Sequence, residues 1–352
     1  MPQEGTAIRT GPATLEDVAA LAGVSRATAS RVLNPSARTV GAANRKKVEA
    51  AAAELGYVVN ASAQTIARGR SDSIAFVVNA IPDDYLSPIA AGVFHAADAA
   101  DLMVTMVSTN ESAARARRII SVFRGLRPRL LILAGSRHVD DAAFGPVVDE
   151  LRAFEADGGR VVVIGQVGLP FDTVSIDNVG VGRAIARAFL DLGYEQFTVF
   201  AGPAKAVTPR DRADGILAEF ADAGIHLPPD RIITGAFSRE GGYVAAGEFL
   251  RRRSDTEAIL ATADAVALGA IARLREAGVK LPGDVAISGV DDLLALRDVT
   301  PALTTVRLPW NEVGVIALEL GLEPAPTDGP RTRTLSGHVV LRESSPRLVP
   351  GG

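Results

Sequence analysis

Apolar residues near the start of the chain recur at the spacing of one helical face. Leu15, Val18, Ala19 and Ala22 follow the i, i+3, i+4, i+7 pattern of a helix with one buried side. Thr14 stands directly before this stripe, where its hydroxyl can accept a hydrogen bond from a first-turn amide. The pattern predicts a first helix that begins after Thr14.

A second short helix follows a turn that contains glycine. Gly23 breaks the first helix, and Ser25 can cap a second one whose inner face holds Ala29, Val32 and Leu33. Two short helices joined in this way form either a helix-turn-helix, whose second helix enters the DNA major groove, or an ordinary αα-hairpin. The spacing alone leaves both interpretations open.

The next apolar stripe predicts a third helix over about 44–55. Val48, Ala51, Ala52 and Leu55 share its inner face, and Gly56 ends it. Three helices of this kind suit a small headpiece, which we place at residues 12–58.

From residue 73 onward, continuous apolar runs alternate with amphipathic stretches. Runs rich in β-branched residues suit parallel strands covered on both faces, and repeated βα units predict two doubly wound lobes. The expected strands are 74–78, 103–107, 130–133, 161–164, 174–176, 197–200, 232–233, 258–261 and 285–288. The expected helices include 86–100, 115–124, 181–192, 211–223, 242–252 and 266–277.

Length and composition narrow the class of protein. A chain of 352 residues is too long for one ordinary core and suits two or three domains. No apolar run reaches the ~18 residues of a membrane span, and we expect no secretory signal at the first residues. The chain has no cysteine, which excludes disulfides and favours a cytoplasmic location.

Charge is distributed unevenly along the chain. Residues 1–70 carry nine Lys and Arg against five Asp and Glu, whereas the remainder carries 28 against 36. A basic head on an acidic body concentrates the attraction for phosphates at one end. Because this end holds the predicted helix-turn-helix, the distribution favours DNA binding over a chance fluctuation of surface charge.

Motifs of catalysis and cofactor binding are incomplete or missing. Gly180 and Gly182 open a helix after a strand, as in a dinucleotide-binding turn, but Ile185 occupies the place of the third glycine. No P-loop, nucleophile-elbow or zincin motif occurs, and the four histidines lack metal-ligand spacing. We therefore expect no enzyme activity, no cofactor and no metal.

The residues around the predicted helix-turn-helix resemble those of a known family. The run Thr-Leu-Glu-Asp-Val-Ala-x-x-Ala-Gly-Val-Ser-x-x-Thr-x-Ser-Arg-Val-Leu-Asn over 14–34 is similar to the opening of the LacI/GalR transcriptional regulators. Glu-Leu-Gly-Tyr over 54–57 and Val-Leu-Arg-Glu-Ser over 340–344 extend the likeness over nearly the whole chain.

The resemblance implies an α/β protein with an all-α helix-turn-helix headpiece and a core similar to type I periplasmic binding proteins. A hinge helix and linker at 59–71 would join the headpiece to the core at 72–345. The N-lobe would span about 72–175 and 307–324, and the C-lobe about 176–306 and 325–345. The chain would cross between the lobes near Ser175, Val306 and Pro324.

The resemblance also implies which residues contact DNA. In the family, the second helix reads bases, the third helix reaches phosphates, and the hinge helix inserts an apolar wedge into the minor groove. The matching residues are Thr14, Ser25, Arg26, Ala27, Thr28, Arg31, Asn34, Arg45, Lys47, Tyr57, Asn60, Ala63 and Ile66. Ile66 occupies the wedge position, and the alternative is a linker residue packed on the core. Gly41 replaces the usual Ser or Thr cap, and an additional residue around 35–39 leaves the nearby phosphate contacts open.

An effector site between the lobes is implied in the same way. Arg212 and Asp291 match residues that hold ligand oxygens, and an arginine fork can donate two parallel hydrogen bonds. Tyr85, Phe237 and Asp264 match further effector-contacting positions. The alternatives are a surface arginine, a loop-capping aspartate and aromatic residues packed in the core. Polar groups that some sugar-binding members carry are missing at 165–166 and 263, so both sugars and nucleosides remain candidates.

Together these features predict a dimeric repressor that binds a palindromic operator and responds to a small ligand, most simply a carbohydrate. The tail over 341–352 has no heptads, so no coiled coil is expected to form tetramers. Alternative functions are a solute-binding protein for uptake, a Rossmann-type enzyme, or a regulator that responds to nucleosides or purines.

Overall fold

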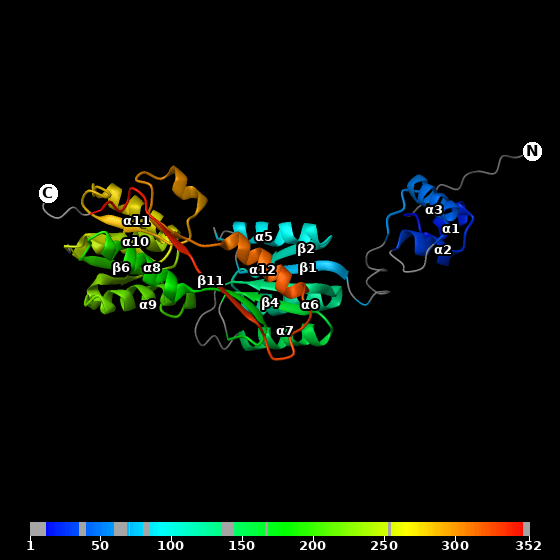
Figure 1. The fold of residues 1–352 in the computed structure, drawn as a ribbon, viewed down its shortest axis with the longest axis horizontal. Helices are drawn as coiled ribbons and strands as arrows, with labels where there is room; N and C mark the ends of the chain where they lie inside the picture. The colour runs from blue at the N-terminus through cyan, green and yellow to red at the C-terminus, as the bar shows by residue number, and fades with distance from the viewer. Residues whose placement is uncertain are drawn as a thin grey trace, which may run out of the picture. The chain divides into compact units, whose positions relative to one another are not determined.

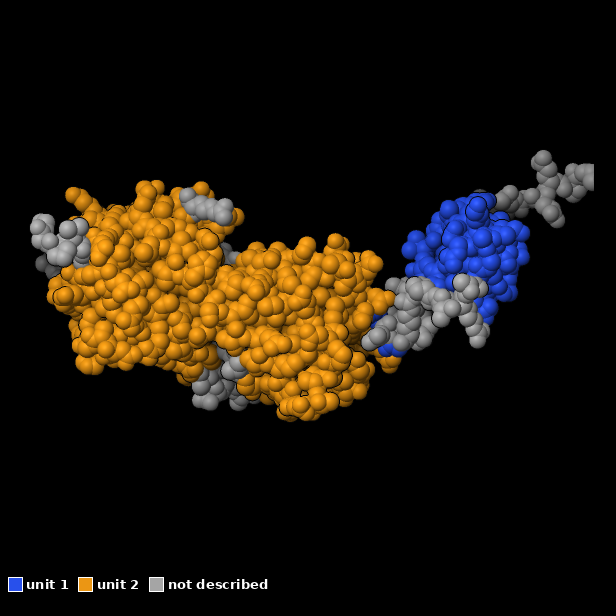
Figure 2. Space-filling view, in the orientation of Figure 1, with its two compact units in different colours: residues 1–71 blue, residues 72–352 orange. Residues whose placement is uncertain are grey.

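Figure 1 shows the fold, in which a helical unit precedes an α/β core with two parallel sheets. The chain divides into compact units at residues 1–71 and 72–352 (Figure 2). The computed structural model describes residues 12–34, 40–59, 69, 71–79, 85–135, 144–165, 168–252 and 255–347. The expected fold class, a helix-turn-helix followed by a two-lobed doubly wound core, is confirmed. The expected hinge helix lies outside the described residues.

The headpiece consists of α1 (Leu15–Ala22), α2 (Arg26–Leu33) and α3 (Ala42–Glu54). Thr14 caps α1 in a capping box, because its amide donates to a carboxylate oxygen of Asp17 at 2.8 Å while its hydroxyl accepts from the Asp17 amide. Gly23 ends α1 with a φ of 65°, a left-handed conformation that glycine adopts most readily. Local sequence signals therefore set the angle between α1 and α2.

One residue from each helix forms the centre of the headpiece core. Val18, Ala29 and Val48 are all fully buried. The small side chain of Ala29 lets α2 approach the other two helices closely. The opposite side of α2 is consequently left for solvent or for a partner.

The N-lobe is a six-stranded parallel sheet in the order β11-β5-β4-β3-β1-β2. Its strands are β1 (Ser71–Val78), β2 (Met103–Ser108), β3 (Pro128–Ala134), β4 (Arg160–Ile164), β5 (Asp172–Ile176) and β11 (Thr332–Leu335). Its helices are α5 (Leu86–Ala99), α6 (Ala113–Leu126), α7 (Gly145–Ala156) and α12 (Trp310–Leu322). Along β1, Ile74 and Phe76 pack with α5 and α12, whereas Ala75 and Val77 pack with α6 and α7. Alternate side chains thus bury both faces, as a parallel sheet requires.

The C-lobe is a four-stranded parallel sheet in the order β7-β6-β8-β9. Its strands are β6 (Phe197–Ala201), β7 (Ile232–Thr234), β8 (Ala258–Ala261) and β9 (Ala286–Ser288). Its helices are α8 (Asn178–Asp191), α9 (Val207–Asp222), α10 (Arg239–Arg252) and α11 (Asp264–Glu276), with short 3-10 helices η2 (Pro229–Arg231) and η3 (Leu294–Asp298). Helices α8 and α9 cover one face of the sheet, and α10 and α11 cover the other.

Three chain crossings join the two lobes. The first leads from β5 into α8, and the second leads from β10 (Thr305–Arg307) into α12. The third returns between β11 and β12 (His338–Val340), and β12 pairs antiparallel with β10. This third crossing therefore lies at 335–338 and not near Pro324, because β11 pairs with β5 and adds a strand to the N-lobe sheet. Among the residues that the structure describes, no helix is long and apolar enough to cross a membrane.

Helices α8 and α9 cross at two glycines. A Cβ on Gly182 would lie 2.1 Å from the carbonyl oxygen of Arg212, and one on Gly215 would lie 2.1 Å from that of Val179. Such separations lie far inside van der Waals contact, so only glycine permits this approach. In the sequence, Gly182 resembles a glycine of a dinucleotide-binding turn. In the structure it lets α8 pack directly against the backbone of Arg212.

Gly182→Ala is expected to lower the free energy of unfolding by ~1–3 kcal/mol, because the two helix backbones must move apart. Gly247→Ala in α10 is the matched control, since its Cβ would meet its nearest neighbour, Nε of Arg273, at an ordinary 3.6 Å. The control should lose no stability and can gain ~0.5–1 kcal/mol from helix propensity. Urea denaturation followed by circular dichroism measures both, and equal stability of the two variants would contradict the close crossing.

Candidate DNA-binding face and effector site

Helix α2 presents two arginines on its exposed side. Arg26, Ala27 and Arg31 are exposed, whereas Ala29 faces the core. NH1 of Arg26 lies 3.3 Å from Oε1 of Glu16 on α1, with both side chains about 70% exposed. An exposed ion pair of this kind is weak, so Arg26 can leave it at little cost. Both guanidinium forks are therefore available for the O6 and N7 atoms of guanine.

Other residues expected at the DNA hold the ends of α1 and α2. Ser25 Oγ accepts from the amide of Thr28 at 3.2 Å and lies 2.9 Å from its hydroxyl. Nδ2 of Asn34 donates to the carbonyl oxygen of Ser30 at 3.0 Å, and Thr14 forms the capping box described above. These four side chains have a local structural role, which does not prevent them from meeting phosphates as well.

The start of α3 carries the expected basic residues on its surface. Arg45 and Lys47 are exposed, and NH1 of Arg45 lies 4.0 Å from Oε1 of Glu49 one turn later. Gly41 supplies no side-chain cap to this helix. Tyr57 is half-buried against the headpiece core. The expected hinge contacts lie outside the described residues: Asn60, Ala63 and Ile66.

Arg212 is buried at the carboxyl edge of the C-lobe sheet. Its side chain is 2% exposed, so the alternative of a surface arginine is wrong. Nε donates to Oδ1 of Asn178 at 3.0 Å, and NH1 donates to the carbonyl oxygen of Thr262 at 2.9 Å. NH2 donates to Oδ1 of Asp291 at 3.0 Å. A buried guanidinium needs such partners because an uncompensated charge away from water is costly.

Asp291 lies after β9 in a turn with an unusual backbone. Its φ is 123°, and that of Asp292 is 56°, both in the region that residues with side chains rarely adopt. The ring centroid of Phe237 lies 6.0 Å from Cζ of Arg212, within the range of a cation–π contact. The fold thus brings Arg212, Phe237 and Asp291 together from three separate loops and helices.

Asp264 lies behind this group and not in contact with solvent. It is fully buried; Oδ2 accepts from the amide of Leu293 at 2.9 Å, and Oδ1 accepts from the hydroxyl of Thr305 at 2.7 Å. Burial raises the pKa of the Asp264 carboxyl to about 7, and repulsion from Asp291 adds to this effect. The geometry therefore disfavours the expected contact of Asp264 with an effector, and favours a role in holding the loop that carries Asp291.

Tyr85 lies at the start of α5 and belongs to the N-lobe side of the core. Its ring centroid lies 5.3 Å from that of Trp310, which sequence reasoning did not single out. Trp310 packs against the apolar clusters of both lobes, and its buried Nε1 has no hydrogen-bond partner among the described residues. The sequence feature that could have identified Trp310 is its position three residues after the end of β10, where the chain enters the N-lobe. The partners of Arg212 described above all lie in the C-lobe.

The Arg212 group lies where an open α/β sheet binds ligands. The chain leaves β6 toward one edge of the C-lobe sheet and leaves β8 toward the other, so the strand order reverses between them. Ligands bind outside the carboxyl ends of the strands at such a point. Arg212 bonds to the carbonyl oxygen of Thr262, directly after β8.

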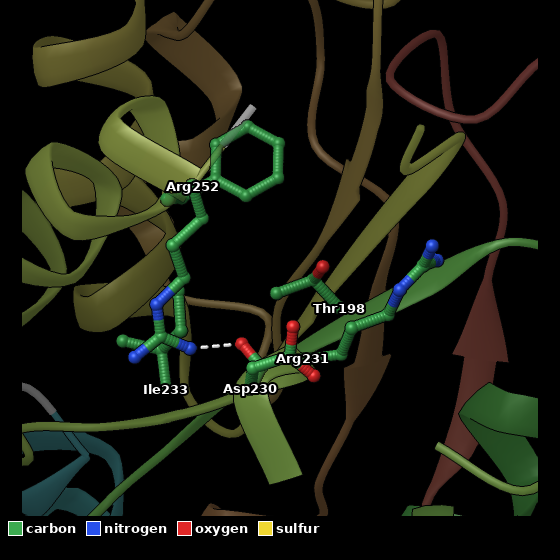
Figure 3. A pocket seen from close by; sticks show the side chains of 6 residues that line it. Thr198, Asp230, Arg231, Ile233 and Arg252 are labelled. Carbon is green, nitrogen blue, oxygen red and sulfur yellow. Dashed lines mark hydrogen bonds between the residues drawn. The ribbon is translucent and has the colours of Figure 1, made fainter. Parts of the chain in front are cut away.

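A cavity of about 160 Å³ lies elsewhere, at the amino ends of β6 and β7 (Figure 3). Thr198, Asp230, Arg231, Ile233, Phe249 and Arg252 line it. Arg252 donates to the backbone of Asp230, and Arg231 donates to Gln196 and Asp255. Because it lies at the opposite end of the strands, this cavity is separate from the Arg212 group.

Comparison with known proteins assigns the two parts of the chain. The profile described as "Bacterial regulatory proteins, lacI family" matches residues 14–60, and that of the "Periplasmic binding protein-like domain" matches residues 186–345. The HTH-type transcriptional regulator CelR of Thermobifida fusca is 32% identical over 94% of this chain and 98% of its own length.

Two solved structures extend the comparison to three dimensions. A transcriptional regulator CelR–cellobiose complex is 30% identical, covers 94% of this chain and 99% of its own, and has a TM-score of 0.70. The Lac repressor dimer bound to operator and the anti-inducer ONPF is 26% identical, covers 96% of this chain and 100% of its own, and has a TM-score of 0.83. The chain therefore belongs to the lacI family of bacterial regulatory proteins.

Proposed function

We propose that this chain represses transcription as a homodimer in the cytoplasm, and that a small polyhydroxylated ligand between the lobes controls its affinity for a palindromic operator. Family membership supports DNA binding by the headpiece. The observation that carries the effector proposal is the buried Arg212–Asp291 pair at the carboxyl edge of the C-lobe sheet. A solute-binding protein for uptake has no use for a helix-turn-helix.

An apolar edge of the N-lobe supports the dimer. β2 is the edge strand of its sheet, and Met103 and Met106 on it are 75% and 37% exposed. Val122 and Leu126 on α6, the next helix along the chain, are 59% and 57% exposed. Exposed large apolar side chains on successive elements of one lobe are candidates for an association surface. A two-fold dimer would present two recognition helices to a palindrome, because one helix reads too few base pairs to be selective.

The chemistry of the Arg212 group suits a ligand with adjacent hydroxyl groups. The three bonds of Arg212 use three of the five N–H groups of a guanidinium and leave two for a ligand. Asp291 can accept from a hydroxyl while keeping its bond to Arg212. Phe237 and the pair Tyr85–Trp310 offer aromatic surfaces for the apolar face of a sugar ring. The cellobiose bound to the relative with 30% identity supports the choice of a carbohydrate.

Arg26→Ala and Arg31→Ala are each expected to weaken operator binding by ~1–3 kcal/mol and to relax base preference at one position of a G-containing half-site. Selection of binding sites from random DNA with each variant measures this. Arg45→Ala is the control, since loss of a phosphate contact should weaken all sequences equally. The same consensus from a variant that lacks both Arg26 and Arg31 would refute their role in base reading.

Ile66→Gly is expected to weaken specific operator binding strongly without changing effector affinity, because the side chain that wedges between base pairs is lost. Ile66→Leu keeps an apolar wedge of similar size and should retain binding. DNA bending, measured by energy transfer at saturating protein, separates the variants. An Ile66→Gly protein that bends the operator as the parent does would eliminate the wedge.

Arg212→Ala is expected to keep operator binding and to lose the response to effector, because a guanidinium's paired hydrogen bonds have no substitute nearby. Arg212→Lys, which keeps the charge without the fork, should also fail. Thermal shift against cellobiose and a panel of sugars and nucleosides is the measurement. Arg210→Ala is the control, since Arg210 bonds to its neighbour Asp211 and not to the Arg212 group. A ligand that stabilises parent and Arg212→Ala equally would place its site elsewhere.

A further inference from the structure

The Arg212 group is connected to the first interlobe crossing. Nε of Arg212 donates to Oδ1 of Asn178, which begins α8 two residues after the end of β5. Nδ2 of Asn178 in turn donates to the carbonyl oxygen of Ile176 at 3.3 Å. The guanidinium is therefore bonded to the segment in which the chain passes from the N-lobe to the C-lobe.

The residue next to Asp291 is connected to the other two crossings. Oδ2 of Asp292 accepts from Nε of Arg307 at 2.6 Å, and Oδ1 accepts from NH2 of Arg342 at 2.5 Å. Arg307 is the last residue of β10, which leads into the N-lobe. Arg342 follows β12, on which the chain has returned to the C-lobe. One carboxylate thus joins both crossing strands.

Backbone contacts reinforce this junction. The amide of Asp291 donates to the carbonyl oxygen of Val306 at 2.9 Å, and NH1 of Arg342 donates to that of Leu303 at 2.9 Å. The Asp292 side chain is 10% exposed. Although burial raises the pKa of its carboxyl, the hydrogen bonds from Arg307 and Arg342 outweigh burial and bring this pKa below its ordinary value. The carboxylate is therefore ionised at neutral pH, and both hydrogen bonds are charge-assisted.

We infer that Asp292, clasped by Arg307 and Arg342, is the positioning residue through which the Arg212–Asp291 pair acts on the interlobe crossings. We call the three side chains of Asp292, Arg307 and Arg342 the Asp292 clasp. Asp291 and Asp292 are covalently adjacent, both with positive φ, so we expect a displacement of the Asp291 backbone to reach Asp292. All three crossings are then connected through the bonds of Arg212 to Asn178 and Asp291, the peptide link from Asp291 to Asp292, and the Asp292 clasp, and a ligand at Arg212 and Asp291 would disturb this connection.

This inference rests on the proposed effector role of Arg212 and Asp291, but its test needs no ligand. Trp310 is the only tryptophan in the chain and stands three residues after Arg307. It packs against the apolar clusters of both lobes, so its emission and its quenching by acrylamide report on the second crossing. The full-length protein can therefore be examined without operator or sugar.

The first measurement compares Asp292→Asn, Arg307→Gln and Arg342→Gln with the parent. Asparagine tolerates a left-handed backbone, so Asp292→Asn removes the charge without forcing the turn to change. Each variant is expected to shift Trp310 emission to the red and to increase acrylamide quenching. Asp284→Asn is the matched control, because Asp284 is an acid of the same lobe that bonds to the amide of Lys280 away from the clasp. If Asp292→Asn does not fold, as judged by circular dichroism, the two arginine variants carry the test.

The second measurement separates coupling from mere support of the fold. Asp291→Asn should shift Trp310 emission in the parent, and it should cause no further shift in an Asp292→Asn or Arg307→Gln background. The inference is overturned if Asp291→Asn shifts Trp310 emission as much in a clasp-variant background as in the parent. It is also overturned if the Trp310 signal of a clasp variant matches that of Asp284→Asn. An unresponsive Trp310 in Asp291→Asn itself would also overturn it. Failure to find a sugar ligand would instead count against the proposed function. The Trp310 measurements would still be interpretable, because they need no ligand.

Discussion

The burial of a guanidinium is the constraint on which the carboxyl edge of the C-lobe sheet depends. Arg212 lies 2% exposed, and a charge so placed must be met by acceptors from every side. Those acceptors come from the first crossing, from the end of β8 and from the turn after β9. The position of Arg212 therefore requires that three separate segments keep their mutual arrangement.

The packing of α8 against α9 also fixes the position of Arg212. Gly182 and Gly215 let α8 and α9 approach until their backbones touch, and the carbonyl oxygen of Arg212 is one of the touching atoms. Behind the site, Asp264 is buried and bonded to Leu293 and Thr305, which holds the turn that carries Asp291. Close packing and buried polar bonds thus fix the positions of Arg212 and Asp291.

The same turn links the Arg212–Asp291 pair to the strands that lead into and out of the interlobe crossings. In an α/β sheet, loops at the carboxyl ends of the strands gather ligand-binding groups, and here one of these loops also touches the crossing strands β10 and β12. A ligand changes the balance between two lobe arrangements only to the extent that it binds them unequally. In the proposed function, a loop that contacts both the Arg212 group and the crossing strands provides a direct physical route to such a difference.

The sequence by itself determined the elements and much of the function. The helical spacing of apolar residues and the capping residues identified the headpiece helices, because Thr14, Ser25 and Gly23 act through neighbouring backbone groups. Continuous apolar runs identified the nine strands of the two sheets that lie before residue 290. The short strands β10, β11 and β12 carried no such signal, since three or four residues of mixed polarity acquire their pairing only from distant partners.

Only the tertiary structure decided the burial and partners of the candidate site residues. The third crossing was expected near Pro324 but lies in the segment after β11, because β11 pairs with β5 through a long-range contact that the local sequence does not indicate. Asp264 and Asp291 were both expected to contact the effector. In the structure, Asp264 bonds to the amide of Leu293, whereas Asp291 bonds to Arg212. The tertiary structure also brought in Trp310 and Asp292, whose neighbours are distant in the chain. Local pattern records which face of an element is apolar, whereas the partner of a buried charge is set by how separate elements pack.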